Sequence, residues 1–454
     1  MVRVGLCHYK VGGTDGVSLE MDKWKVALER LGHQAVLCGG DLGTAAGHRI
    51  EELYHHRPDT ERIRYNAFKR LRDWSEGELA GNILALADRI EGKLAEFVDQ
   101  YAIDVLVPNN IWSLDGNLAA AIAFARVVKA RKIPAVGHHH DFFWEWFRGN
   151  RPTCGAVRRL VEEVLPPEGE GIGHLVINRI AQGQLRRRRG LSSQVVPNVF
   201  DFSAPSWEPD DYNRDFRDRI GVDARDVLVL QATRVVTRKG IELAIDLVAE
   251  LSRPHYLSQL RRAGLYDGRP FGPRSRIVLV LAGYSEDPSG EYLKRLKQKA
   301  GAAGIEIRYI SGLVRARRTY EGGEKRYSLW DCYVHADLVT YPSYYEGWGN
   351  QFLEAVFARL PLVMFEYPVY KTDIKEKGFR VISLGDKIAG RDELGLVRVD
   401  REALSRAAQG AVRALTDPTE RQRMVEHNFR LGRELYSLDS LEAYIVDALG
   451  KYLR

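Results

Sequence analysis

The sequence predicts an α/β protein made of two Rossmann-like, doubly wound domains. Short apolar runs typical of buried strands alternate with helical stretches through most of the 454 residues. This alternation stops once, in a stretch rich in Pro, Ser and Asp near residues 200–211, and then begins again. The chain is also longer than one hydrophobic core usually supports, which favours two domains.

The first series of elements begins at the N-terminus. Residues 3–7 predict a strand, residues 17–31 have helical periodicity, and residues 35–38 predict the next strand. Residues 45–100 are polar with helical spacing, and later strands are expected at 103–107, 134–137, 174–177 and 194–197. We therefore expect a first domain at residues 1–200 and a linker at residues 201–224.

The second series begins with a strand at residues 227–232. Residues 253–274, rich in Arg, Gly, Pro and Tyr, are typical of an insertion, and the chain is helical from about residue 401. Further strands are expected at 277–282, 305–310, 337–340, 362–365 and 381–383. This series predicts a second domain at residues 225–431.

Composition excludes several classes of protein. Apolar residues make up 45% of the chain and charged residues 28%, as in globular proteins. No apolar run approaches the roughly 20 residues that span a bilayer, and no signal-peptide pattern is present. The four cysteines lack metal or redox spacing, so we expect reduced thiols and a cytoplasmic protein.

The formal net charge of +6 is mildly basic. Its local runs, at residues 186–189 and 315–318, are interpreted as solvated faces, with an acidic substrate or a membrane surface as alternatives. No nucleic-acid-binding motif is present, so nucleic acid is not an expected partner.

One stretch, residues 341–354, carries the strongest functional signal. Glu346 follows a predicted strand, Glu354 lies in the helix after it, and Gly347 and Gly349 let the backbone approach a ligand. A helix that begins under such a loop offers free N–H groups to a phosphate, and the two carboxylates can accept hydrogen bonds from sugar hydroxyls. A nucleotide sugar has both kinds of group.

The pattern Pro-Ser-x-x-Glu-Gly-x-Gly-x-x-x-x-Glu-Ala in this stretch resembles the donor-site signature of the family 4 retaining glycosyltransferases. The resemblance implies the GT-B architecture, in which two such domains face a cleft. It also implies that residues 432–454 form a helix packing back on the first domain. The donor-binding residues that it implies here are Glu346, Gly347, Trp348, Gly349, Asn350 and Glu354.

Other loops that follow predicted strands also resemble the corresponding loops of this family. Arg234 and Lys239 match the cations that bind the donor diphosphate, where they would stabilise the negative charge of the leaving group. Arg238 competes with Lys239 for this role. Further donor-binding positions implied by the resemblance are Gly13, Gly283, Gly312 and Leu313.

Three consecutive histidines precede Asp141. A metal site is not expected here, because consecutive residues do not easily face one ion. In the family a histidine followed by an acid lies near the reacting carbon of the sugar, and His140 with Asp141 matches best. His138 and His139 stay open as alternatives for that position.

The acceptor is expected on the first domain. Candidate acceptor-binding residues are Thr14, Asp15, Asn109, Trp112, His138 and His139. Asp15 has a second interpretation, as the residue that caps the helix after it.

These expectations describe a retaining hexosyltransferase. It would move glucose or mannose from a nucleotide diphosphate to a small acceptor, similar to the family members that build compatible solutes from acceptors such as glucosylglycerate. No metal or other cofactor is expected, because cations and a helix end can replace one. Two alternatives stay open: a nucleotide-sugar epimerase of the same architecture, and a non-catalytic protein that binds nucleotide sugars. Homo-oligomerisation and peripheral membrane contact stay open too.

Overall fold

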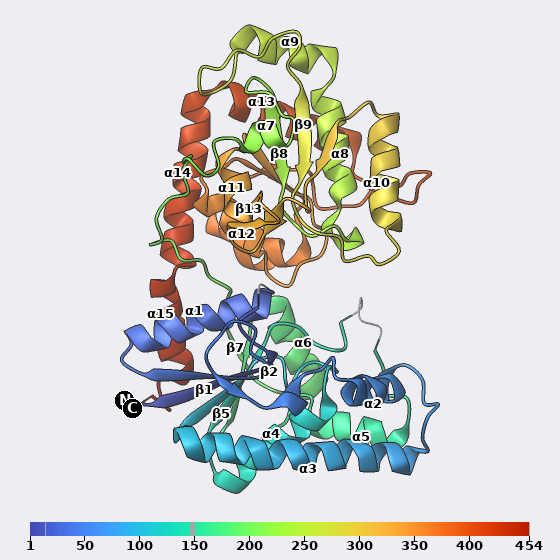
Figure 1. Ribbon diagram of the computed structural model, residues 1–454, viewed down its shortest axis with the longest axis vertical. Helices are drawn as coiled ribbons and strands as arrows, with labels where there is room; N and C mark the ends of the chain where they lie inside the picture. The colour runs from blue at the N-terminus through green and yellow to red at the C-terminus, as the bar shows by residue number, and fades with distance from the viewer. Residues whose placement is uncertain (14, 146–149, 454) are drawn as a thin grey trace. The chain divides into compact units, whose positions relative to one another are not determined.

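The computed structural model describes residues 1–13, 15–145 and 150–453 (Figure 1). The chain divides into two compact units. Unit 1 comprises residues 1–201 and 436–454, and unit 2 comprises residues 202–435. Each unit has a parallel sheet with helices around it, which confirms the predicted α/β fold class.

The sheet of unit 1 has seven strands in the order β3-β2-β1-β4-β5-β6-β7, and the strand pairs are parallel. The strands are β1 Arg3–Lys10, β2 Gln34–Asp41, β3 His48–Arg49, β4 Val105–Pro108, β5 Ala135–His139, β6 Ile172–Val176 and β7 Gln194–Val195. Strands β4 and β5 are buried along their whole length. Strands covered on both faces need continuous apolar runs, which is why the sequence predicts them well.

The helices of unit 1 are α1 Gly16–Arg30, α2 Pro58–Phe68, α3 Glu76–Tyr101, α4 Leu118–Arg131, α5 Gly155–Val164, α6 Arg179–Arg189 and α15 Leu438–Leu449, with a short 3₁₀ turn, η1 Glu51–Leu53. Figure 1 shows the C-terminal helix α15 beside α1. Leu441 and Ile445 of α15 are fully buried and share a core cluster with Trp24 of α1. The last helix therefore completes the core of unit 1, although residues 202–435 separate it from that unit in sequence.

The main sheet of unit 2 has six parallel strands in the order β10-β9-β8-β14-β15-β16. The strands are β8 Val227–Gln231, β9 Ile277–Leu281, β10 Ile307–Tyr309, β14 Leu338–Tyr341, β15 Leu362–Met364 and β16 Ile382–Ser383. The order reverses at β8, between β9 and β14, and such a point is where doubly wound sheets bind ligands.

The helices of unit 2 are α7 Phe216–Arg219, α8 Ile241–Leu251, α9 Pro254–Ala263, α10 Glu291–Ala302, α11 Leu329–Val334, α12 Asn350–Phe357, α13 Arg401–Thr416 and α14 Pro418–Leu435, with the short turns η2 Thr237–Lys239, η3 Tyr370–Ile374 and η4 Lys375–Lys377. Two residues of α9, Tyr256 and Leu260, are buried in the same cluster as β8 and α8. The stretch expected as an insertion is therefore part of the core.

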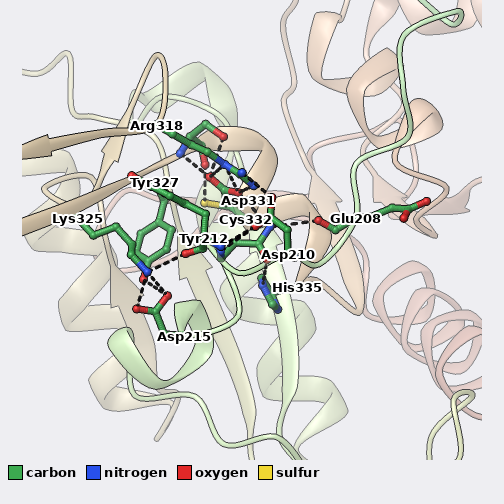
Figure 2. Close-up of polar contacts among 12 residues, drawn as sticks. Glu208, Asp210, Tyr212, Asp215, Arg318, Lys325, Tyr327, Asp331, Cys332 and His335 are labelled. Carbon is green, nitrogen blue, oxygen red and sulfur yellow. Dashed lines mark hydrogen bonds and ion pairs between the residues drawn. The ribbon is translucent and has the colours of Figure 1, made fainter.

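Polar contacts hold the expected linker and a small second sheet together (Figure 2). This sheet consists of β11 Val314–Arg315, β12 Thr319–Glu321 and β13 Glu324–Ser328, and a hairpin, β17 Gly390–Arg391 with β18 Val397–Arg398, lies elsewhere in unit 2. Arg318 pairs with Asp331 and Asp210, both at 2.5 Å, and Lys325 pairs with Asp215 at 2.9 Å. Residues 202–224, expected as a linker, thus belong to unit 2.

Within the described ranges, none of the helices combines the length and apolar character needed to cross a membrane.

Because α15 is buried on one face, we expect mutations on its buried and exposed faces to change the stability of unit 1 by different amounts. Ile445→Ala should lower the free energy of unfolding of unit 1 by about 2–5 kcal/mol, because it leaves a cavity under α1. Val446→Ala, at a neighbouring position that is 51% exposed, should change it by less than about 0.5 kcal/mol. Hydrogen exchange of the β1 amides in denaturant measures the free energy of unfolding of both variants. Equal effects would show that α15 does not support the core.

Candidate active site

Two loops of unit 2 meet at the carboxyl edge of its sheet. One contains η2 after β8, and the other contains Glu346 after β14, the neighbouring parallel strand. Lys239 Nζ lies 2.5 Å from Glu346 Oε1, and Arg238 Nη1 lies 3.0 Å from Glu346 Oε2. The spatial order of the strands thus joins residues more than a hundred positions apart.

The ion pair of these loops is buried. Lys239 is 2% exposed and Glu346 is 7% exposed. Gly240 follows at once with a φ of +59°, and a Cβ atom there would collide with the carbonyl oxygen of Pro342. Only glycine accommodates both this backbone angle and this approach, so the two loops pack closely because position 240 lacks a side chain.

The cluster of Lys239, Arg238 and Glu346 has more positive than negative charge. Burial alone would raise the pKa of Glu346, but Lys239 and Arg238 outweigh it and lower that pKa to about 2. Burial, together with the positive charges of Arg238 and Arg234, lowers the pKa of Lys239 to about 8, although Glu346 opposes the shift. One carboxylate therefore faces several cations, and the cluster can accept another anion.

The third predicted cation, Arg234, lies in the same β8 loop and forms an ion pair with Glu286 from the loop after β9. These loops also pack tightly, since a Cβ atom on Gly283 would overlap the carbonyl group of Thr233. Arg234 is thus held at the edge of the sheet between β8 and β9, where its positive charge also acts on Lys239.

Helix α12 begins directly behind Glu346. Gly349 precedes its first residue, Asn350, with a φ of +140°, and the carbonyl of Trp348 accepts a 2.6 Å hydrogen bond from the Tyr367 hydroxyl. Gly347 lies between Glu346 and Trp348 in the same loop. Because helix N-termini carry a partial positive charge and free N–H groups, this end suits a phosphate.

The second acid of the motif, Glu354, lies inside α12. It is 8% exposed and accepts a 2.8 Å hydrogen bond from the Tyr333 hydroxyl of α11. Burial and the neighbouring carboxylate raise the pKa of Tyr333, so the phenol stays protonated and donates this bond. Tyr333 is a contact that sequence reasoning missed, because nothing in the pattern of α11 indicates which face meets α12.

Gly312 and Leu313 form a turn after β10. The Leu313 amide donates to the Ile310 carbonyl at 2.8 Å, and the Leu313 carbonyl accepts from the Tyr327 amide at 2.8 Å. No heavy atom lies within 4 Å of a Cβ built on Gly312, so this turn has open space beside it.

In unit 1 the predicted histidines lie at the end of β5. Asn109, after β4, places its Oδ1 3.1 Å from His138 Nδ1 and 3.2 Å from His140 Nε2. With the amide in this orientation its oxygen can only accept, so both of these ring nitrogens carry the proton. Asn109, which was expected to bind the acceptor, is 2% exposed and orients the two imidazoles.

His139 points to the opposite face of β5, because side chains alternate along a strand. Its Nε2 lies 3.0 Å from His174 Nδ1, and the two rings stack. His139 is fully buried there, whereas His138 and His140 share the other face with His8. The structure thus separates His139 from the other two members of the triplet.

The histidines of this edge are neutral near pH 7. Burial lowers the pKa of His138 to about 3, and it lowers the pKa of His140 well below the usual value. Asn110, which sequence reasoning did not select, accepts from the backbone N–H of His140 at 2.7 Å and of Asp141 at 3.3 Å. Its φ of +55° is unusual for a residue other than glycine, and only the structure reveals it.

The remaining candidate residues of unit 1 lie in the loops after β1 and β4. Asp15 caps α1, accepting from the backbone amide of Ser18 at 3.2 Å. Trp112 is fully buried, and its indole N–H donates to the Ala121 carbonyl of α4 at 3.1 Å. Gly13 lies beside the Asp15 carboxylate in the β1–α1 loop, and Thr14 lies outside the described residues.

No group of three or more His, Cys, Asp or Glu side chains in the described parts of the chain is arranged to hold a metal ion.

Solved structures share this fold. A glycosyltransferase from Rickettsia africae matches with a TM-score of 0.61 and 11% identity, over 100% of this chain and 99% of that one. Sucrose-phosphate synthase from Thermosynechococcus elongatus matches with a TM-score of 0.60 and 13% identity, over 100% and 99%. At such identities the likeness concerns the fold alone.

Sequence relatives carry more weight. Residues 213–382 match the family model for glycosyl transferases group 1. Mannosylglucosylglycerate synthase from Petrotoga mobilis is 40% identical over 96% of this chain and 99% of its own, and the enzyme of that name from Thermotoga maritima is 39% identical over 97% and 98%. The epimerase and the non-catalytic alternatives are not favoured by these matches. The chain belongs to the mannosylglucosylglycerate synthase family of group 1 glycosyltransferases, and it is a hexosyltransferase.

Proposed function

We propose that the protein transfers mannose from a nucleoside diphosphate sugar to glucosylglycerate, with retention of the anomeric configuration. The observation that carries the proposal is the buried cluster of Lys239, Arg238 and Glu346, because its excess positive charge suits a diphosphate. The sugar and the acceptor are taken from the name shared by the two relatives that align with nearly the whole chain.

The diphosphate would lie against Lys239, Arg234 and the N-terminus of α12. These groups are held before the donor arrives, since Glu346 fixes Lys239 and Glu286 fixes Arg234. Preorganised cations stabilise the charge that develops on the leaving phosphate without reorganising during the reaction. Glu346 and Glu354 would accept hydrogen bonds from the hydroxyls of the donor.

The transfer breaks the bond between the anomeric carbon and the diphosphate oxygen and forms one to an acceptor hydroxyl on the same face of the sugar. The hydroxyl proton passes to an oxygen of the departing diphosphate, so the products are a nucleoside diphosphate and the glycoside. His140 would accept a hydrogen bond from a donor hydroxyl through Nδ1, because its Nε2–H is committed to Asn109. The side chain of Asp141, next to it, would help shape this part of the site.

The proposal includes no metal ion. Lys239, Arg234 and the end of α12 provide the positive charge that a divalent cation supplies in other transferases. Activity should therefore persist when EDTA is added, and a strict requirement for added Mg²⁺ or Mn²⁺ would contradict this part of the proposal.

The reaction itself is the first test. Glucosylglycerate is incubated with nucleoside diphosphate mannose and glucose carrying each common base, and the product is examined by NMR. We expect one mannose donor to give a glycoside with the anomeric configuration of the donor. Hydrolysis without transfer for every donor would refute the acceptor, and an inverted product would refute retention.

Removal of Lys239 should weaken donor binding selectively. Lys239→Ala should raise the Kd of the nucleoside diphosphate by about ten- to a hundredfold, because a charge-assisted contact to the phosphates is lost. The matching nucleoside, which lacks phosphates, should bind the variant as it binds the wild type. Calorimetry measures both ligands, and an equal loss for the two would indicate general misfolding.

Donor binding should also depend on pH. A bound anion favours the charged form of Lys239, so affinity should be full below the pKa of about 8 in the free protein. It should fall as the pH rises above that value, by up to about tenfold per pH unit until the pKa in the complex is reached. Lys239→Arg, whose guanidinium stays protonated, should flatten the profile. A wild-type affinity that stays constant from about pH 7 to about pH 9.5 would contradict this role of Lys239.

A further inference from the structure

A cavity of about 440 Å³ in unit 1 has no role in the site described so far. It is bounded by residues 143–145 and 150–152, by α5 and by the end of α6. Four arginines line it, Arg151, Arg158, Arg188 and Arg189, with only two glutamates, Glu145 and Glu162. A cavity of this size accommodates a small organic molecule, and its charge favours an anion.

Two polar atoms in the lining are buried without a hydrogen-bond partner among the residues that the structure describes. Asn150 is 7% exposed, and its Nδ2 donates to Asp115 Oδ2 at 2.8 Å, which fixes the amide and leaves Oδ1 without a donor. Arg189 donates from Nη2 to the carbonyl of Pro166 at 3.0 Å, while its Nε has no acceptor. Such unpaired groups are costly, so a ligand that supplies both a donor and an acceptor fits this cavity.

The lining also offers an aromatic side chain, Trp144, one face of which stacks on Phe142 with 4.3 Å between the ring centroids. The indole N–H of Trp144 donates to Gln184 Oε1 at 3.0 Å, so the ring is held in place. The guanidinium carbon of Arg188 lies 5.7 Å from the centroid of this ring. An aromatic ring beside a cation suits a sugar that carries an acid group, because the ring covers the apolar face of the sugar and the cation binds the acid.

The wall of the cavity begins at Phe143, three residues after His140 in the chain. The chain passes from Asp141 through Phe143, whose amide donates to the Ser113 carbonyl at 2.8 Å, into the cavity wall. Asp115, which holds Asn150, lies in the same loop after β4 as Asn109 and Asn110. The loop after β4 therefore orients His140 and also holds Asn150 of the cavity wall, which α5 and α6 complete.

We propose that this cavity binds the acid end of the acceptor, a small hydroxylated organic acid. The carboxylate would bind Arg158 and Arg188, and a hydroxyl would donate to Asn150 Oδ1. This inference rests on the proposed function, since it assigns the acceptor of that same reaction to a defined part of unit 1.

The test compares a charged acceptor with a neutral one. In the wild type, kcat/KM for glucosylglycerate should exceed that for glucosylglycerol, which lacks the carboxylate. The double variant Arg158→Gln, Arg188→Gln should reduce this preference by about ten- to a hundredfold. The KM for the donor should not change. A preference equal to that of the wild type would overturn the proposal.

The chain offers a matched control. Arg159→Gln with Arg187→Gln removes the same charge from adjacent, exposed positions of α5 and α6 that do not line the cavity. This control should keep the wild-type preference. If it loses the preference to the same extent, general surface charge is responsible and the cavity is not the site.

Direct binding separates failure of this inference from failure of the proposed function. Glucosylglycerate and inorganic phosphate are titrated calorimetrically into the wild type and both double variants. Binding of glucosylglycerate that is lost only in the Arg158, Arg188 variant supports the cavity even if no transfer is detected. Phosphate binding that is lost in that variant while glucosylglycerate binding stays intact would identify an anion effector and overturn the acceptor assignment.

Discussion

The buried ion pair between Lys239 and Glu346 is the interaction on which the proposed donor site depends. Taking either charge out of water alone would cost several kcal/mol, and removing one partner of such a pair typically costs about 3–5 kcal/mol. The pair therefore keeps the loops after β8 and β14 together. Gly240 makes that approach sterically feasible, and Arg238 supplies a second cation to the same carboxylate. The geometry of the anion site is thus built into the folded unit.

The strands were predictable because they are buried on both faces. Every strand of the two main sheets except β3 overlaps a run that the sequence indicated, and β3 contains only two residues. The small sheet β11–β13 was not predictable, since its strands are rich in Arg and Glu and lack an apolar alternation. It is held by ion pairs such as that of Arg318 with Asp331, which join residues through the tertiary fold.

In both units the sequence indicated candidate residues of the site, but it did not indicate which of them are in contact. Lys239 and Glu346 were named from a motif, but their contact depends on β8 and β14 being neighbours in the sheet, which no local pattern specifies. The separation of His139 from His138 and His140 could have been predicted, because side chains alternate between the two faces of a strand. The bridging role of Asn109 was beyond reach, because it depends on the register between the ends of β4 and β5.

The two units carry different chemistry at the edges of their sheets. Unit 2 presents fixed cations and a helix N-terminus, which suit a charged leaving group. The end of β5 in unit 1 presents neutral imidazoles, because burial holds the pKa values of His138 and His140 far below 7. Neutral donors and acceptors match sugar hydroxyls without competing for the diphosphate. Because burial keeps these rings neutral near pH 7, they can exchange hydrogen bonds with hydroxyl groups but carry no charge that would attract an anion.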